Sequence, residues 1–104
     1  MALKELQKEV DDWIQQYKLG YFKPHEILAR LMEETGELAR EVNHEFGAKK
    51  KKAAEADNEI GDEIADIFFT LVCMANSLNI DLDEKWIKMM NKYTNRDKGR
   101  WEKK

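Results

Sequence analysis

The chain has 104 residues, of which 38% are charged and 42% are hydrophobic, with five glycines and one proline. Because this length suits one domain and helix-breaking residues are so few, we expect residues 1–104 to form a single all-helical unit. The net charge of −3 gives no overall positive field for nucleic acid, and a single cysteine excludes an internal disulfide and fits a reducing cytoplasm.

The first predicted helix covers about residues 3–17 and ends before Gly20. Its apolar residues recur every three or four positions, which is the pattern of a helix with one buried face: Leu3, Leu6, Val10, Trp13 and Tyr17. We expect Trp13 to belong to the core. The segment has no apolar run of the kind found in signal peptides, so we expect a cytoplasmic protein.

The second predicted helix begins at Pro24, because proline is tolerated in the first turn, and runs to Phe46 with Gly47 as its stop. Residues 48–56 form a basic connector. Asp57 or Asn58 is the expected N-cap of the third helix.

The third predicted helix is apolar nearly all round over residues 67–75. That run is too short to cross a bilayer, and we expect no membrane partner. A helix of this composition is normally buried on every side, which so short a chain would hardly achieve alone. We therefore expect a four-helix bundle completed by oligomerisation, as a homodimer or a homotetramer. The alternative is a tight monomeric bundle.

The fourth predicted helix follows Asp81, which forms a capping pattern with Glu84. Its apolar side carries Leu82, Trp86, Met89 or Met90, and Tyr93. Residues 97–104 form a charged tail.

Two pairs of carboxylates stand out in the second and third helices. Glu34 and Glu37 are three residues apart, as are Glu63 and Asp66, so each pair lies on neighbouring turns of one helix face. Both pairs border an apolar stripe, and packing the stripes together would bring the pairs towards each other. Carboxylate oxygens are the ligands that Mg²⁺ and Mn²⁺ prefer. The alternative is a solvated acidic face, with Arg30 and Arg40 as ordinary ion-pair partners.

Histidine content argues against a redox iron site. A di-iron carboxylate bundle would need two Glu-x-x-His motifs, whereas the chain holds one, from Glu41 to His44. The other histidine, His25, lies in the first turn of the second helix. We expect neither histidine to be a metal ligand.

In order along the chain, these motifs resemble the MazG-type nucleoside triphosphate pyrophosphohydrolases. The stretch Glu33-Glu34-Thr35-Gly36-Glu37-Leu38-Ala39 matches the family's E-E-x-x-E motif, and Glu63-Ile64-Ala65-Asp66 matches its E-x-x-D motif. The resemblance covers roughly residues 20–96, and Ala65 stands where the family often has glycine. It implies a four-helix MazG-like fold and hydrolysis of nucleoside triphosphates, including non-standard ones, to monophosphate and pyrophosphate.

The resemblance also implies roles for individual residues. Metal-binding positions carry over as Glu34, Glu37, Glu63 and Asp66, and we expect Mg²⁺ there, with Mn²⁺ as a substitute. Glu33 or one of the ligands would orient or deprotonate the attacking water. Contacts with the substrate are expected from residues on the fourth helix and from residues just before Pro24: Lys88, Lys92, Arg96, Phe22 and Lys23. For the lysine run 49–52, ordinary solvation is the preferred interpretation.

Two other functions remain open from the sequence. One is a specialised pyrophosphohydrolase for dUTP, dCTP or phosphoribosyl-ATP, since short motifs do not encode the shape of a base pocket. The other is a non-enzymatic helical interaction module whose acids are merely solvated. Nucleic-acid binding is the least favoured, because the chain is acidic and the lysine run has no interleaved aromatic residues.

Overall fold

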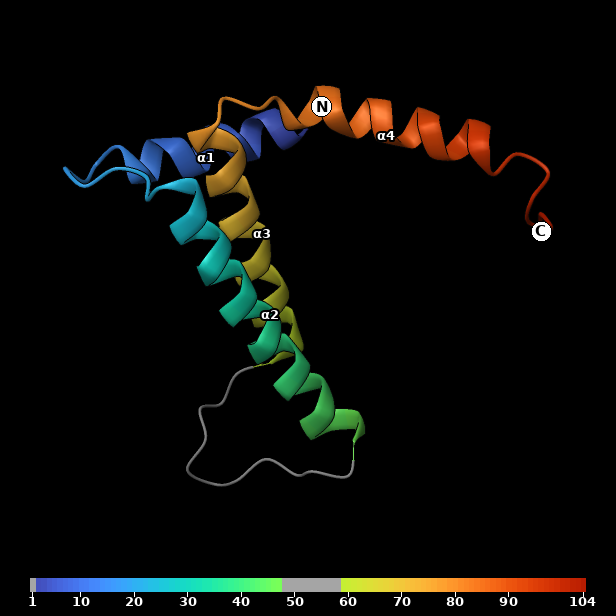
Figure 1. Cartoon of the computed structure of the whole chain (residues 1–104), viewed down its shortest axis with the longest axis horizontal. Coiled ribbons are helices and arrows are strands. Elements are labelled where there is room, and N and C mark those ends of the chain that lie inside the picture. Colours follow the sequence, from blue (N-terminus) through green and yellow to red (C-terminus); the bar gives the residue numbers. More distant parts are fainter. Residues whose placement is uncertain (1, 48–58) are drawn as a thin grey trace.

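A computed structural model of the chain describes residues 2–47 and 59–104, and these residues form four helices without strands. The helices are α1 (Ala2–Ile14), α2 (Pro24–Phe46), α3 (Ile60–Ser77) and α4 (Leu82–Arg96). Figure 1 shows α2 and α3 as a long antiparallel hairpin, with α1 crossing its upper end. The predicted all-α class and the four helices are confirmed.

The single chain is open rather than compact. Its radius of gyration is 17.4 Å, whereas a compact domain of this length has a value of about 13 Å. The reason is visible in Figure 1: α4 leaves the junction of α1 and α3 and extends away from the hairpin, with α1 as its main packing partner. Consecutive α3 and α4 are bent by 109° at their break.

Local signals placed most helix ends correctly. Pro24 begins α2 and Gly47 caps its end. The Asp81 side chain accepts hydrogen bonds from the backbone N–H groups of Asp83 and Glu84, at 3.0 and 3.2 Å. The α1 helix ends at Ile14, earlier than expected, because Tyr17 donates to Ile14 in a tight turn that ends the helix. The connector 48–56 and the expected caps Asp57 and Asn58 lie outside the described residues; Glu59 holds the N-cap of α3.

The hydrophobic core is small and lies where α1 crosses the hairpin. Its buried members are Val10, Ile27, Val72 and Cys73, with partly buried side chains packed around them. Cys73 is buried, and burial raises the pKa of its thiol, which disfavours the reactive thiolate. Because the core lies at the end of the hairpin that α1 crosses, α1 and the loop between α1 and α2 are held against that half of the hairpin.

The junction of α1, α3 and α4 contains a network of paired polar groups. The Gln7 amide donates to Asn76 Oδ1 at 2.9 Å and to the Ile80 carbonyl at 2.8 Å, and its oxygen accepts from the Leu82 backbone at 3.0 Å. Asn76 Nδ2 donates to the Tyr21 hydroxyl at 3.0 Å, which donates to Asp11 at 2.6 Å. This network joins the loop between α1 and α2, and the start of α4, to the end of α3.

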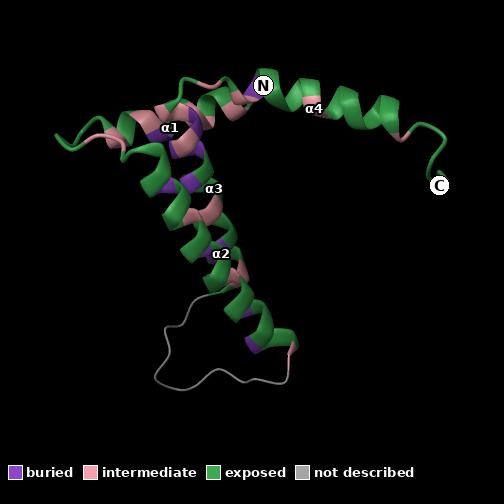
Figure 2. Ribbon diagram, viewed as in Figure 1, coloured by how far each residue is buried: buried purple, intermediate pink, exposed green. Residues whose placement is uncertain are grey.

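Much of the apolar surface of the hairpin and of α4 faces solvent in the single chain. Figure 2 shows α4 exposed along almost its whole length. Leu28, Met32, Phe46, Phe68 and Trp86 are all more than 40% exposed. No single helix among the described residues is long and apolar enough to cross a membrane; α3 and α4 reach that length and composition only as a bent pair.

Candidate active site

Three acidic side chains converge inside the α2–α3 hairpin. One carboxylate oxygen from each of Glu34, Glu37 and Glu63 lies within 4.8 Å of the other two. Glu34 and Glu63 are buried, with 5% and 2% of their surfaces exposed, while Glu37 is exposed. The two helices place them there because Glu34 and Glu37 are one turn apart on α2, opposite Glu63 in the first turn of α3.

These carboxylates are poorly compensated. Arg30 contacts Glu34 Oε1 at 3.0 Å, an ion pair that the alternative interpretation of a solvated acidic face predicted. Among the described residues, however, Glu34 Oε2 and Glu63 Oε2 have no hydrogen-bond partner. Buried acceptors of this kind are costly, and native proteins rarely leave them unpaired without a functional reason. The arrangement is therefore suited to a cation that the protein itself does not supply.

The pKa of Glu63 also reflects the shortage of positive charge around these carboxylates. Burial raises this pKa above its ordinary value of 4.5, and the negative charge of Glu37 raises it further. The charges of Asp66 and Glu34, and a hydrogen bond with Glu37, act in the same direction. All these contributions favour the neutral acid, and a positive charge placed among these groups would lower the pKa of Glu63 and favour the carboxylate.

Asp66 and Glu33 lie beside this cluster, on the wall of a cavity of about 590 Å³. Asp66 is exposed, one turn after Glu63 on α3, and is not among the three converging carboxylates, although its charge acts on Glu63. Glu34 belongs to both the cluster and the cavity wall. The cavity thus opens directly onto the carboxylates, with Glu33 and Arg30 at its edge.

The rest of the cavity wall is mostly apolar and includes several aromatic side chains. Phe22 lines it, as expected from the sequence, but so do Trp13, Tyr21 and Phe69. Trp13 is half exposed and packs edge-to-face against Phe69, with ring centroids 5.9 Å apart. The expectation that Trp13 belongs to the core is wrong, because the helix ends one residue later and leaves the ring beyond the core. The available signal was the second aromatic residue four positions on, Tyr17, whose ring lies 5.2 Å from that of Trp13.

The comparisons with known proteins agree with this geometry. Residues 22–101 match the family model described as the MazG nucleotide pyrophosphohydrolase domain. The chain belongs to the MazG nucleotide pyrophosphohydrolase family. The expected fold and enzyme class are therefore confirmed, and the interpretation as a non-enzymatic interaction module is not supported.

Two Bacillus proteins illustrate the relationship to other MazG proteins. The chain is 54% identical to YpjD of Bacillus subtilis (strain 168), a protein of uncharacterised function, over 99% of this chain and 93% of the relative. A crystal structure of YpjD, described as a candidate pyrophosphatase, has a TM-score of 0.78 at 53% identity and covers 89% of this chain and 95% of that one. The crystal structure of a Bacillus-conserved MazG protein, a nucleotide pyrophosphohydrolase, has a TM-score of 0.79 at 48% identity, covering 95% and 96%.

The basic residues expected at the MazG substrate site are not brought to it within one chain. Lys88, Lys92 and Arg96 are exposed on α4, and within the described part of the chain no α4 residue lines the cavity. Lys23 is exposed at the N-cap of α2, and its backbone N–H donates to Glu26 at 3.0 Å. It borders the cavity-lining Phe22 but does not line the cavity itself.

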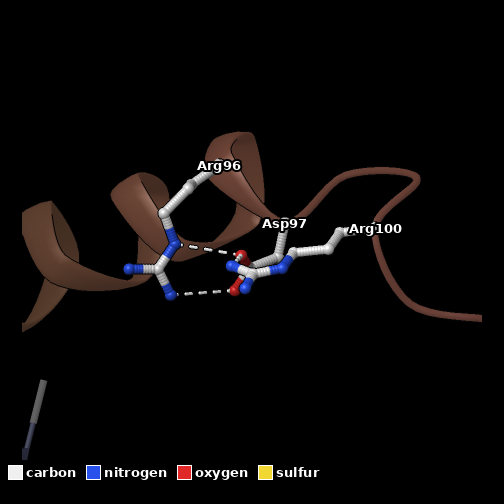
Figure 3. A network of polar contacts seen from close by, with 3 residues as sticks. All are labelled: Arg96, Asp97 and Arg100. Atoms are coloured by element: carbon white, nitrogen blue, oxygen red, sulfur yellow. Dashed lines mark hydrogen bonds and ion pairs between the residues drawn. The ribbon is translucent and has the colours of Figure 1, made fainter.

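Arg96 is engaged locally at the end of α4. Its Nε and Nη2 atoms donate to the two carboxylate oxygens of Asp97 at 2.9 and 3.0 Å, and Arg100 reaches the same carboxylate at 3.3 Å (Figure 3). The hydrogen bond from Arg96 lowers the pKa of Asp97 and raises that of Arg96 itself. Asp97 therefore holds two guanidinium groups together at this position.

Proposed function

We propose that this MazG domain hydrolyses nucleoside triphosphates, including non-standard ones, to nucleoside monophosphate and pyrophosphate with Mg²⁺. The observation that supports this most directly is the convergence of Glu34, Glu37 and Glu63, whose carboxylate oxygens lie within 4.8 Å of one another. The two buried members, Glu34 and Glu63, each have one oxygen without a hydrogen-bond partner among the described residues. The reaction is proposed to take place at the border between these carboxylates and the cavity, in a cytoplasmic protein.

The donor set suits a hard divalent cation. Glu34, Glu37 and Glu63 offer only oxygen ligands, and Asp66 on the neighbouring turn is the proposed fourth. No histidine belongs to the cluster, which disfavours zinc and redox iron among the described residues. Mg²⁺ bound there would neutralise charge on the phosphate oxygens; Mn²⁺, which also prefers oxygen ligands, is the proposed substitute.

The hydrolytic step breaks the anhydride bond between the α and β phosphorus atoms. A water molecule adds across this bond, one of its protons must be accepted, and the bridging oxygen leaves with the pyrophosphate. Glu33 is the proposed acceptor of that proton, because its carboxylate lies on the cavity wall beside Glu34 and is exposed enough to contact both water and substrate. Arg30, at the same edge, holds Glu34 in position through their ion pair.

The aromatic side of the cavity is the proposed position of the nucleobase. Phe22 and Trp13 are 57% and 50% exposed, so both rings can offer stacking surface to a flat nucleobase. The cavity volume of about 590 Å³ falls in the range of small-molecule sites and leaves room for a nucleoside.

The test is pyrophosphate release from a panel of canonical and modified nucleoside triphosphates, with Mg²⁺ and with EDTA. We expect metal-dependent formation of monophosphate and pyrophosphate, lost in Asp66→Asn. Glu45→Gln is the matched control, because Glu45 is an exposed acid of α2 outside the cavity. No turnover on any nucleotide, together with no thermal shift from Mg²⁺, would overturn the proposal.

The same panel separates the specialised alternative. If dUTP, dCTP or phosphoribosyl-ATP is turned over with a kcat/KM at least 100-fold above all other substrates, the protein is a dedicated pyrophosphohydrolase. Comparable rates across several bases would support the broader activity. Phe22→Ala and Trp13→Ala should change the ranking of bases if these rings contact the base.

A further inference from the structure

The cavity beside the carboxylates has an unequal distribution of charge. Four acids lie on its wall: Glu26, Glu33, Glu34 and Asp66. Among the described residues, Arg30 is the one positively charged residue that lines it. A nucleoside triphosphate carries several negative charges, and a divalent cation at the carboxylates would neutralise only part of them. Within the cavity wall, Arg30 is therefore the side chain that can offer positive charge directly to the substrate.

The contact between Arg30 and Glu34 leaves most of the guanidinium available. Arg30 Nε lies 3.0 Å from Glu34 Oε1, and Glu34 Oε2 has no hydrogen-bond partner among the described residues. The pair thus uses one carboxylate oxygen and not the two-bond arrangement that arginine often forms with a carboxylate. The Arg30 side chain is 66% exposed, whereas that of Glu34 is 6% exposed. A guanidinium has five N–H donors, so those on its terminal nitrogens can contact a second group while Nε stays beside Glu34.

The position of Arg30 along α2 relates it to the two ends of the cavity. It precedes Glu34 by four residues, so it lies about 6 Å from Glu34 along the helix axis, towards the start of α2. Phe22, on the aromatic side of the cavity, comes just before that start. The antiparallel α3 repeats this order, with Asp66 next to the carboxylates and Cys73 about two turns further towards the core. Arg30 therefore lies between the aromatic side and the converging carboxylates.

This order along the cavity matches the order of groups in a nucleotide. The nucleobase is proposed to lie on the aromatic side, and the metal ion is proposed to lie among the carboxylates. The α-phosphate joins the nucleoside to the two outer phosphates, so it occupies the middle of the substrate. A guanidinium in the middle of the cavity is therefore nearest to the α-phosphate, and its planar set of donors suits two oxygens of one phosphate.

We infer that Arg30 binds the α-phosphate of the substrate through its terminal N–H groups while its Nε stays beside Glu34. This inference rests on the proposed function, since it assigns a residue to one group of the proposed substrate. The α-phosphate stays with the nucleoside when pyrophosphate leaves, so Arg30 also holds the monophosphate product. The ion pair with Glu34 fixes the direction of the guanidinium and thereby places the α-phosphate beside the carboxylate cluster.

This arrangement requires arginine rather than any positive charge. A lysine has one ammonium group, which Glu34 and the phosphate would have to share, and it lacks the planar donors that contact two phosphate oxygens at once. Arg30→Lys therefore keeps the charge and removes the geometry, whereas Arg30→Gln removes both. Arg40→Lys and Arg40→Gln are the matched controls, because Arg40 is an exposed arginine of the same helix outside the cavity.

The test measures the binding of parts of the substrate and needs no turnover. Wild type and the Arg30 and Arg40 variants, with Mg²⁺ present, are titrated in a calorimeter with the four common ribonucleosides, with their 5′-monophosphates and with pyrophosphate. The nucleoside and monophosphate that wild type binds most tightly are then compared across the variants. Thermal melting without ligand shows whether each variant is folded. Arg30→Lys retains a cation for Glu34, so it keeps the test decisive if Arg30→Gln is unstable.

We expect wild type to bind the monophosphate more tightly than the nucleoside. Arg30→Lys should weaken monophosphate binding about 10-fold, because a two-bond contact becomes a single shared one, and Arg30→Gln should weaken it further. Binding of the nucleoside and of pyrophosphate should change by no more than about two-fold, since neither contains the α-phosphate. In hydrolysis assays, the monophosphate should become a correspondingly weaker product inhibitor, while inhibition by pyrophosphate should stay the same. The Arg40 variants should resemble wild type throughout.

Three results would overturn the inference: a wild type that binds no monophosphate more tightly than its nucleoside, Arg30 variants that bind the monophosphate as wild type does, or an equal loss for monophosphate and pyrophosphate. Failure of the proposed function looks different, because wild type would then release no pyrophosphate from any triphosphate. The calorimetry would still report whether Arg30 distinguishes the monophosphate from the nucleoside.

Discussion

Two clusters of polar side chains lie between the helices, and they are built on opposite principles. At the junction of α1, α3 and α4, Gln7, Asn76, Tyr21 and Asp11 form a chain of hydrogen bonds between 2.6 and 3.0 Å in which donors meet acceptors. Inside the hairpin, Glu34, Glu37 and Glu63 bring acceptors together, and two buried oxygens stay without partners. The first cluster satisfies itself, whereas the second depends on something bound.

This difference separates a structural role from a functional one. A network whose donors and acceptors are all paired fixes the relative positions of the helices. Removing one member therefore costs the hydrogen bonds that it made with the others. A cluster of like charges destabilises the protein that contains it unless a ligand compensates. Substitutions in the two clusters should therefore act on stability in opposite directions.

Glu63→Gln should have the largest effect. Removing a buried acid among like charges should leave the metal-free protein as stable as wild type or more stable. It should also abolish the thermal shift from Mg²⁺ and lower kcat/KM roughly 100-fold or more. Differential scanning fluorimetry and pyrophosphate release measure these effects, with Glu45→Gln as control. A lower melting temperature with an undiminished Mg²⁺ shift would assign Glu63 a purely structural role.

The same position should show a pH signature. Because the pKa of Glu63 is raised in the folded protein, the stability linked to its neutral form is complete below pH 4.5 and is lost as the pH rises through the raised pKa. Glu63→Gln should remove this part of the pH dependence from metal-free protein. Mg²⁺ binding requires the carboxylate and should strengthen over the same pH range. Urea unfolding across pH, with EDTA, provides the measurement.

Asn76→Ala should be the most damaging change at the junction. It removes three hydrogen bonds with the partly buried residues Gln7 and Tyr21, so we expect a loss of about 2–3 kcal/mol in the free energy of unfolding. The loss should be equal with and without Mg²⁺, unlike the effect of substituting Glu34, Glu37 or Glu63. Asn91→Ala, at an exposed position of α4, is the control and should change little.

Tyr21→Phe should have a smaller effect of about 1 kcal/mol, since it removes a single hydroxyl and its bonds. Burial and the hydrogen bond to Asp11 raise the pKa of Tyr21 to about 12. Its contribution is therefore complete below the ordinary value of 10.0 and is lost as the pH rises towards 12. Wild type should lose this increment in alkaline urea titrations, and the phenylalanine variant should not.

Asp97→Asn should have the smallest effect and the opposite sign for substrate binding. Asp97 holds Arg96, which we expect to contact the substrate, so its neutralisation should free this guanidinium group for phosphate. Because exposed ion pairs are weak, we expect KM to fall by no more than about five-fold with kcat unchanged. Steady-state kinetics at two ionic strengths tests this. A rise in KM would mean that Asp97 positions Arg96 for the substrate rather than competing for it.

Much of the fold and part of the site could be predicted from local patterns. Pro24, Gly47 and Asp81 mark helix ends because capping depends on a few neighbouring residues. Glu34, Glu37, Glu63 and Asp66 were predicted as a group because their spacing places them on facing turns, and the structure brings the first three together without Asp66. Trp13 was misplaced, since periodicity shows which face a residue occupies and does not show where the packing partner ends.

The sequence by itself determined the four helices, the caps at Pro24, Gly47 and Asp81, and the acidic motifs, because each depends on contacts within a few residues along one chain. Only the tertiary structure decided that Asp66 and Glu33 stand on a cavity wall beside the carboxylates, that Trp13 lines that cavity, and that α4 points away from it. These features depend on crossing angles and on where the small core ends, and both are set by packing between segments that are distant along the chain.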